Sequence, residues 1–185
     1  RVEQRNLVYC IGFTQEVASA EILKRHEYLG QYGELDKLSV VRNGFTGKGQ
    51  KGPSFSVYIT YRTELQASLA ILALNGMVHN EQTVRASFGT TKYCTYFLKK
   101  RNAQTCQTVV SFIALTARMR LMNTEVESPN REIFNNQQNI AEEILRKNIR
   151  KAEQLAEQQA GKHSVFPSLK NIIEEFGYDH PHPNP

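Results

Sequence analysis

Two short stretches of sequence decide the fold: Leu7-Val-Tyr-Cys-Ile-Gly-Phe13 and Ser54-Phe-Ser-Val-Tyr-Ile-Thr-Tyr61. Successive side chains of a strand point to opposite faces of the sheet, so Ser56, Tyr58 and Thr60 face away from the apolar side of the second stretch. In the first stretch, Tyr9 and Ile11 likewise point outward. The sets expected to face inward are Val8, Cys10 and Phe13 in the first stretch, and Phe55, Val57, Ile59 and Tyr61 in the second.

Two tyrosine rings on the outer face of one sheet indicate a surface for unpaired nucleic-acid bases. Every base has a π face, and stacking on an aromatic side chain contributes roughly 1–3 kcal/mol per base. Aromatic residues also favour strands in general. Plain packing within the sheet is therefore the alternative interpretation of Tyr9 and Tyr58.

The residues around these two stretches predict two helices and two more strands. A first helix is expected over residues 19–28, with Ser19 as its cap. Thr63 is expected to cap a second helix over residues 64–74, whose apolar residues form a broad stripe. The additional strands are expected over residues 35–41 and 83–89.

This order of elements is βαββαβ, the split βαβ arrangement of ferredoxin-like α+β folds. It predicts a four-stranded antiparallel sheet with both helices packed on one face and the other face open. Arg85 and Ser87 of the last strand point outward with the tyrosines. The loop over residues 43–53 joins two strands and is rich in glycine and lysine. The residues expected to contact phosphates or base edges are Arg42, Lys48, Lys51, Arg85 and Lys92.

The order of elements and the two tyrosine-bearing strands resemble the RNA recognition motif, a module that binds single-stranded RNA. Residues 8–13 are similar to the hexamer of its first strand, with Tyr9 at the stacking position. Residues 54–61 are similar to the octamer of its third strand, with Tyr58 at the fifth position. Ser56 stands where the octamer normally has another aromatic residue, so we expect a platform for two bases. The outer-face residues expected to contact RNA are Tyr9, Ile11, Ser56, Tyr58, Arg85 and Ser87.

A more specific resemblance covers residues 1 to about 100. Its segments are Val2-Glu-Gln-Arg-Asn-Leu-Val-Tyr9, Gly52-Pro-Ser54 and Arg85-Ala-Ser-Phe-Gly-Thr-Thr-Lys-Tyr-Cys-Thr-Tyr-Phe-Leu-Lys99. They resemble the recognition-motif domain of the RING-type ubiquitin-ligase subunit of the Ccr-Not deadenylase complex. The resemblance implies a role in mRNA decay and post-transcriptional regulation, with single-stranded RNA and Ccr-Not proteins as partners. In that family a RING finger and a helical linker precede the domain, which fits the abrupt start at Arg1, and ubiquitin transfer is expected to belong to that RING.

The family continues into a zinc knuckle of three cysteines and one histidine, and this chain departs from that pattern. Cys94 is in place, but Cys106 comes too late and the next histidine is His163. A structural zinc site needs four ligands with short internal spacings. We therefore expect no metal and no other cofactor, and interpret the two cysteines as ordinary thiols.

Composition and motifs favour a binding module over an enzyme. Twenty-three Lys and Arg against eighteen Asp and Glu give a formal net charge of +5, a mild excess that permits phosphate binding. Neither a glycine-rich phosphate loop before a helix nor an evident pair of nucleophile and base is present. Three widely spaced cysteines and the lack of a visible signal peptide or membrane span predict a cytoplasmic or nuclear protein without membrane contact.

The rest of the chain predicts helices. Residues 129–161 have apolar positions spaced along one side of a long helix, which indicates a coiled coil or partner-binding helix or, alternatively, a helix lying on the domain. The tail over residues 162–185 has a short amphipathic segment that either docks on another protein or folds back. The expected division is thus a recognition motif over 1–92, a divergent linker over 93–128, the long helix and the tail.

Two classes of function are consistent with the sequence. The first is binding of single-stranded RNA by the open face of the sheet. The alternative is a protein-interaction module whose sheet face is covered by a partner or by the chain's own C-terminal half.

Overall fold

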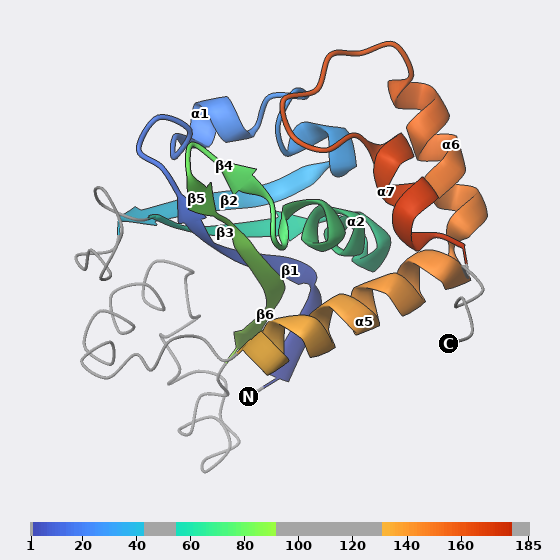
Figure 1. The fold of residues 1–185 in the computed structure, drawn as a ribbon, viewed down its shortest axis with the longest axis horizontal. Coiled ribbons are helices and arrows are strands. Elements are labelled where there is room, and N and C mark those ends of the chain that lie inside the picture. The colour runs from blue at the N-terminus through green and yellow to red at the C-terminus, as the bar shows by residue number, and fades with distance from the viewer. Residues whose placement is uncertain (1, 43–54, 92–130, 179–185) are drawn as a thin grey trace, which may run out of the picture.

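The computed structural model describes residues 2–42, 55–91 and 131–178, and it confirms the predicted α+β architecture (Figure 1). One four-stranded antiparallel sheet has the strand order β2-β3-β1-β6. Its strands are β1 (Val2–Phe13), β2 (Leu35–Arg42), β3 (Phe55–Tyr61) and β6 (Arg85–Thr91). A small hairpin precedes the last of these and consists of β4 (Val78–His79) and β5 (Gln82–Thr83).

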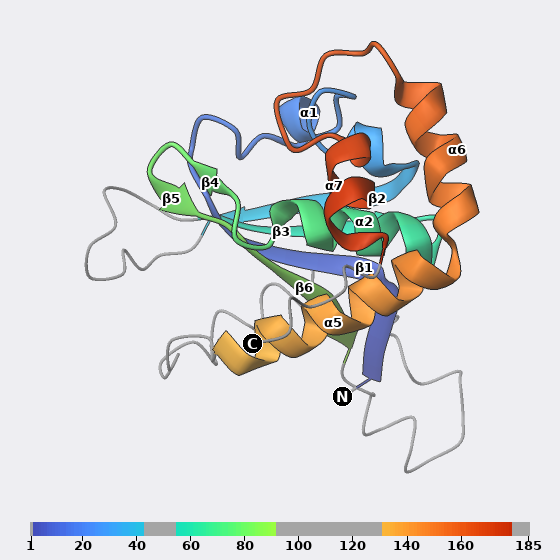
Figure 2. The same ribbon diagram turned by 45° about the vertical axis from the view of Figure 1, so that its right-hand side comes forward.

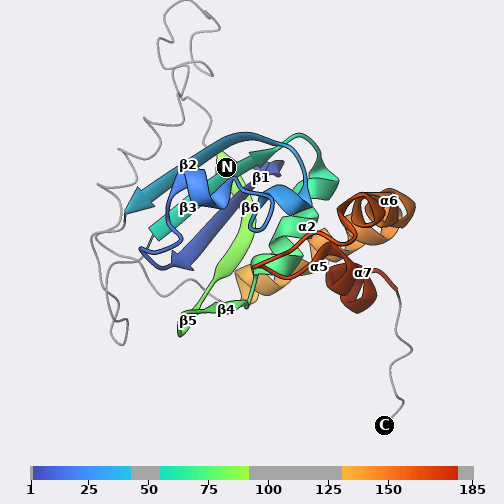
Figure 3. The same ribbon diagram turned by 90° about the horizontal axis from the view of Figure 1, so that it is seen from above.

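Helices cover one face of this sheet. The described helices are α1 (Ala20–Leu23), the 3-10 turn η1 (Gly30–Tyr32), α2 (Glu64–Leu74), α5 (Arg131–Lys147), α6 (Ile149–Gln159) and α7 (Leu169–Phe176). Seen from above, the sheet lies on one side and α2, α5, α6 and α7 lie together on the other (Figure 3). The face that carries the inward-pointing residues of the strands is therefore the helix-covered face.

The core forms between the sheet and α2. Strand β1 is central, and its Cys10 lies between Val57 of β3 and Ala86 of β6. All three of these residues are fully buried. The residues predicted to face inward belong to this core, which confirms the strand phase predicted from the sequence: Val8, Cys10, Phe13, Phe55, Val57, Ile59 and Tyr61. Val84, which precedes β6, and Ala86 and Phe88 of β6 also belong to it.

Helix α2 is buried on every side. Nine of its eleven residues are buried, including Ser68, whose hydroxyl donates to the carbonyl of Glu64 at 2.8 Å. A helix that is apolar all round must be covered by a second layer beyond the one it packs on. The sheet covers one side of α2, and α5 and α7 cover the other (Figure 2).

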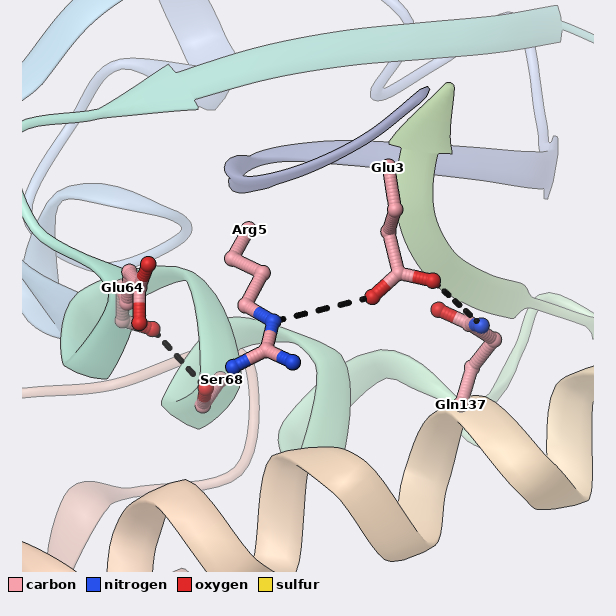
Figure 4. Close-up of polar contacts among 5 residues, drawn as sticks. All are labelled: Glu3, Arg5, Glu64, Ser68 and Gln137. Atoms are coloured by element: carbon pink, nitrogen blue, oxygen red, sulfur yellow. Dashed lines mark hydrogen bonds and ion pairs between the residues drawn. The ribbon is translucent and has the colours of Figure 1, made fainter. Parts of the chain in front are cut away.

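We call residues 131–178, which contain α5, α6 and α7, the helical cap. The cap shares one hydrophobic core with the sheet and α2. Polar contacts also join the two. Asn75 Nδ2 donates to Gln138 Oε1 at 2.9 Å. Figure 4 shows the second contact, in which Gln137 Nε2 donates to Glu3 Oε2 at 3.0 Å. The cap residues buried in the shared core are Ala141, Ile144, Leu145, Ala152, Phe166, Leu169, Ile172 and Ile173.

The cap differs from the predicted single long helix. The chain leaves the helical path at Asn148, whose φ is −121° and ψ is 23°, and the side-chain amide of Asn148 donates to the carbonyl of Ile144 at 2.9 Å. This break separates α5 from α6 and allows α6 to pack beside α7. The apolar stripe lies on the domain, as the alternative interpretation expected, and the tail segment folds back as α7.

The first helix is also shorter than predicted. Only Ala20–Leu23 is helical, and Ser19 occupies the cap position without a side-chain capping bond. The backbone N–H of Leu29 bonds to the carbonyl of Leu23 at 3.2 Å, so the chain tightens into turns before η1. Thr63, by contrast, caps α2 as predicted, and its hydroxyl accepts a bond from the N–H of Gln66 at 3.3 Å.

Candidate nucleic-acid interface

The two tyrosines lie side by side on the face of the sheet opposite α2. Tyr9 of β1 is directly opposite Tyr58 of β3, and Ser39 and Ser87 continue this row on the outer strands. The ring centroids of Tyr9 and Tyr58 are 4.9 Å apart with an interplanar angle of 37°. This separation matches the roughly 4.8 Å spacing of neighbouring strands, so the two rings pack against each other.

A second row of residues lies next to the tyrosines. It runs across the sheet as Val41, Ser56, Ile11 and Arg85. The hydroxyls of Tyr9 and Ser56 are 3.4 Å apart and join the two rows. Ser56 stands where the octamer of the recognition motif normally has another aromatic residue, and its hydroxyl makes this contact instead. The structure therefore brings together six of the predicted residues: Tyr9, Ile11, Ser56, Tyr58, Arg85 and Ser87.

The structure describes only some of the cations that were predicted to contact RNA. Arg85 lies in the second row, on the outer strand β6. Arg42 is exposed at the end of β2, but it pairs with the core residue Phe55, so strand alternation places it on the helix-covered side of the sheet and not with the tyrosines. Lys48, Lys51 and Lys92 lie outside the described residues. Of the predicted cations, the described residues thus place Arg85 on the face of the tyrosines, where Lys37 of β2, which pairs with Thr60, is a further cation.

The centre of this face is buried, which differs from the open face that the sequence predicted. Tyr58 is 7% exposed and Leu7 is 1% exposed, and neither belongs to the core between the sheet and α2. Ser56 and Ser87 are also buried, whereas Tyr9 is half-buried. The contact between the rings of Tyr9 and Tyr58 contributes to this burial.

Leu7 is a residue of this face that sequence reasoning missed. It lies opposite Thr60 on β3, in the same alternating phase as Tyr9 and Ile11. A Cβ atom on Gly89 would lie 2.4 Å from Leu7 Cγ, so the glycine leaves the space that the leucine fills. The alternation along β1 was the signal that places Leu7 beside the tyrosines.

Burial also fixes the charge state of the ring pair. Removal from water raises the pKa of Tyr58 and the pKa of Tyr9, and for Tyr9 the bond to Ser56 offsets part of this rise. Both phenols are therefore neutral at physiological pH. The rings offer π faces and hydroxyls, and attraction for phosphate has to come from neighbouring cations such as Arg85 and Lys37.

The described residues supply no metal site. Among residues 2–42, 55–91 and 131–178, no three His, Cys, Asp or Glu side chains form a group that can hold a metal ion. Cys10 is a free, buried thiol, and His163 is exposed. Cys94 and Cys106, the cysteines that the sequence analysis compared with the zinc knuckle, lie outside the described residues. Within those ranges, no helix is both long and apolar enough to cross a membrane.

Comparisons with known proteins point to regulators of transcription. No protein-family model matches the chain. A protein of Schizosaccharomyces pombe named as a general negative regulator of transcription is 40% identical over 104 residues, which are 55% of this chain and 21% of that protein. The general negative regulator of transcription subunit 4 of Saccharomyces cerevisiae is 35% identical over 109 residues, 54% of this chain and 19% of that protein. The chain thus spans about a fifth of the length of these curated relatives, and its matched half is homologous to a segment of them.

Two solved structures that match part of this chain are RRM3 domains. The Mip6 RRM3 domain has a TM-score of 0.37 and 15% sequence identity, and the match covers 46% of this chain and 94% of that domain. The Pes4 RRM3 structure has a TM-score of 0.36 and 12% identity, covering 48% of this chain and 96% of that one.

Proposed function

We propose that this chain is a single-stranded RNA-binding module of a Ccr-Not-associated ubiquitin-ligase subunit that acts in mRNA decay and post-transcriptional regulation. The observation that carries the RNA-binding part is the ring pair Tyr9 and Tyr58, held on the two central strands of a βαββαβ sheet. Homology to general negative regulators of transcription supports the assignment to a regulatory assembly. Ubiquitin transfer is assigned to a RING outside this chain, and catalysis is assigned to none of its residues.

In this proposal Tyr9 makes the main stacking contact. Tyr9 is half-buried, whereas Tyr58 is nearly enclosed and supports the Tyr9 ring from one side. One base stacks on Tyr9, and Arg85 and Lys37, on the two outer strands of the same face, hold the backbone phosphates. Stacking tolerates different bases, and phosphate contacts make the affinity fall as salt rises.

Titration of labelled single-stranded RNA tests this function. Oligouridylate and oligoadenylate are each titrated with the wild-type chain and with Tyr9→Ala. Loss of one stacking ring is expected to weaken binding roughly 5- to 150-fold, for both sequences alike. Tyr178→Ala is the matched control, because Tyr178 is 49% exposed on the helical cap, away from the sheet face. Its affinity is expected to equal that of the wild type.

Circular dichroism establishes that each variant is folded before its affinity is compared. A folded Tyr9→Ala chain with unchanged affinity contradicts the stacking proposal. Equal losses in Tyr9→Ala and Tyr178→Ala also contradict it, because a ring on the cap has no contact with the proposed RNA path.

One observation favours the alternative function, a protein-interaction module. Leu7 and Tyr58 are almost fully buried although no described helix lies on their face of the sheet. Burial of this kind is typical of a surface held in a permanent contact. The alternative predicts no RNA binding by the wild type at low salt, together with a lower free energy of unfolding for Tyr9→Ala. The RNA-binding proposal predicts binding at low salt that weakens steeply as salt rises.

A further inference from the structure

Strand β2 forms one margin of the four-stranded sheet, and among the described residues its outer side meets no other strand. The helical cap lies away from this margin, beyond α2 (Figure 3). A strand at a margin carries main-chain N–H and C=O groups that point out of the sheet, and these groups are a template for pairing with another chain. Within the described part of the chain, no main-chain hydrogen bond from outside the sheet reaches residues 36–42.

The length and composition of β2 suit such pairing. Proteins commonly keep edge strands short, interrupt them with proline or twist them away with bulges. Strand β2 is eight residues long and contains neither proline nor glycine. A bulge between Leu35 and Lys37 disturbs its start, whereas residues 37–42 pair regularly with β3. Leu38 and Val40 of this regular segment are half-buried, so a further strand beside β2 removes more of their apolar surface from water.

The side chains of β2 favour a second copy of the same strand as the partner. Two copies related by a two-fold axis normal to the sheet pair their β2 strands antiparallel and keep the same face of both sheets on one side. Directly opposite residues of an antiparallel pair point to the same face. Because faces alternate along a strand, this condition is met only when the pairing is centred on a residue and not between two residues.

Centring the pairing on Ser39 makes β2 complementary to itself. Residue 36 then stands opposite residue 42 of the other copy, so the exposed Asp36 and Arg42 form an opposite-charge pair at each end of the paired segment. Leu38 stands opposite Val40, and these two apolar residues cover each other. Centring on Leu38 instead places Asp36 opposite Val40, and centring on Val40 places Arg42 opposite Leu38. Each of these two alternatives sets a charge against an apolar side chain.

We propose that β2 is a dimerisation edge, at which two copies of this chain pair their β2 strands antiparallel about Ser39. The inference goes beyond RNA binding and gives a role to Arg42, which lies off the tyrosine face. The pairing joins two four-stranded sheets into one continuous sheet with both tyrosine faces on the same side. Tyr58 lies opposite Ser39, so three strand spacings of roughly 4.8 Å each place the Tyr58 residues of the two copies about 14 Å apart.

Charge exchange followed by sedimentation equilibrium tests the dimer and its register. The wild-type chain is expected to show a monomer–dimer equilibrium. Asp36→Arg and Arg42→Asp each place like charges opposite one another at both ends, and each is expected to raise the dimer dissociation constant roughly tenfold or more. An equimolar mixture of the two variants restores both opposite-charge pairs and is expected to dimerise about as tightly as the wild type. Lys170→Glu, at an exposed position of α7, matches the charge change of Arg42→Asp and is expected to have no effect.

Three results overturn the proposal. The first is a wild-type chain that stays monomeric at every concentration, which is also the result expected if the edge pairs with a strand of another protein. The second is a dimer that neither variant weakens, because a different surface then holds the copies together. The third is a mixture that dimerises as weakly as each folded variant alone. RNA is absent from these measurements, so their outcome is independent of the RNA-binding proposal.

Disulfide crosslinking tests the same register without a change of charge at the ends. Directly opposite residues of antiparallel strands have Cα atoms about 4.5–5.5 Å apart, which a disulfide spans. Ser39→Cys is therefore expected to form a covalent dimer on oxidation. Lys37→Cys, on the same face of the same strand, stands opposite residue 41 and is the matched control, which is expected to crosslink far less. Equal crosslinking of the two variants, or none in either, overturns the proposed pairing.

Discussion

Among the described residues, four tyrosine hydroxyls are withdrawn from water, and two of them hold distant parts of the chain together. Tyr61 donates to the carbonyl of Leu29 at 3.1 Å, and Tyr32 donates to that of Pro167. Burial raises the pKa of both phenols well above 10.0. It also raises the pKa of Tyr9 and Tyr58 on the opposite face of the sheet. Each of these residues therefore favours the neutral form in the folded state.

The raised pKa values predict that the protein loses stability in alkali. In the unfolded chain a tyrosine releases its proton near pH 10.0, but in the folded chain these four release theirs at higher pH. The stabilisation is fully present below pH 10 and is lost as pH rises through the folded values. The buried Cys10 thiol contributes in the same direction from about its ordinary value of 9.0 upward.

Urea unfolding at several pH values between 7 and 12 measures this effect. The free energy of unfolding is expected to be nearly constant to pH 9 and to decrease above pH 10. Tyr61→Phe keeps the ring but removes one titrating group, so its curve is expected to decrease less steeply. A free energy that stays constant to pH 12 contradicts the described burial of these hydroxyls.

The starts of helices α1 and α2 differ in one contact. Thr63 accepts a bond from the N–H of Gln66, whereas Ser19 makes no side-chain bond at the start of α1. Thr63→Ala is expected to lower the free energy of unfolding by about 1 kcal/mol, because one N–H of the first turn of α2 loses its acceptor. Ser19→Ala is the matched control and is expected to change it by less than about 0.5 kcal/mol.

Chemical denaturation at neutral pH measures both variants. If the two substitutions lower the free energy of unfolding equally, the side chain of Thr63 does not stabilise the N-terminus of α2 as proposed. The same comparison also tests the description of α1 as a short element, since a long helix over residues 19–28 would depend on Ser19.

Elements with a clear side-chain period could be predicted from the sequence, and those set by tertiary packing could not. Alternation gave the phase of β1 and β3 correctly, and the capped apolar run gave α2. The hairpin of β4 and β5 was missed because its turn residues Asn80 and Glu81 both have positive φ, with no Asn-Gly pair to signal the turn. The break at Asn148 was missed because asparagine interrupts neither the composition nor the spacing of the helix.

The sequence indicated that a second layer covers α2, but only the structure shows that this layer is the helical cap. The apolar stripe of residues 64–74 is broader than one sheet can cover, and this indicates a second covering layer. Sequence alone left open whether that layer was a partner or this chain. Burial of Leu7 and Tyr58 on the other face had no comparable signal, because both residues alternate as surface residues of a half-covered sheet do.

The shared core predicts that the sheet, α2 and the cap unfold as one unit. Ile172 of α7 is 2% exposed in that core, so Ile172→Ala is expected to cost about 2–5 kcal/mol and to destabilise the whole molecule. Lys170→Ala, at an exposed position of the same helix, is the control and is expected to have little effect.

Two probes read this outcome in one urea titration. Tyrosine fluorescence reports on the sheet, and helical circular dichroism reports strongly on the cap. The two midpoints are expected to coincide in the wild type and to move together in Ile172→Ala. A separate early transition of the helical signal alone contradicts a single cooperative core.

The position of the cap has a consequence for how this chain tolerates change. Thr91, at the end of β6, pairs with Val2, and Gln137 near the start of α5 bonds to Glu3, so β6 and α5 meet at one corner of the molecule. Residues 92–130 connect these two elements, and so they leave and re-enter the fold at neighbouring points. Lengthening a connection costs only about 0.6 kcal/mol per doubling when both ends stay fixed. Residues 92–130 are thus attached where the architecture accepts a longer or shorter connection without a change in the core.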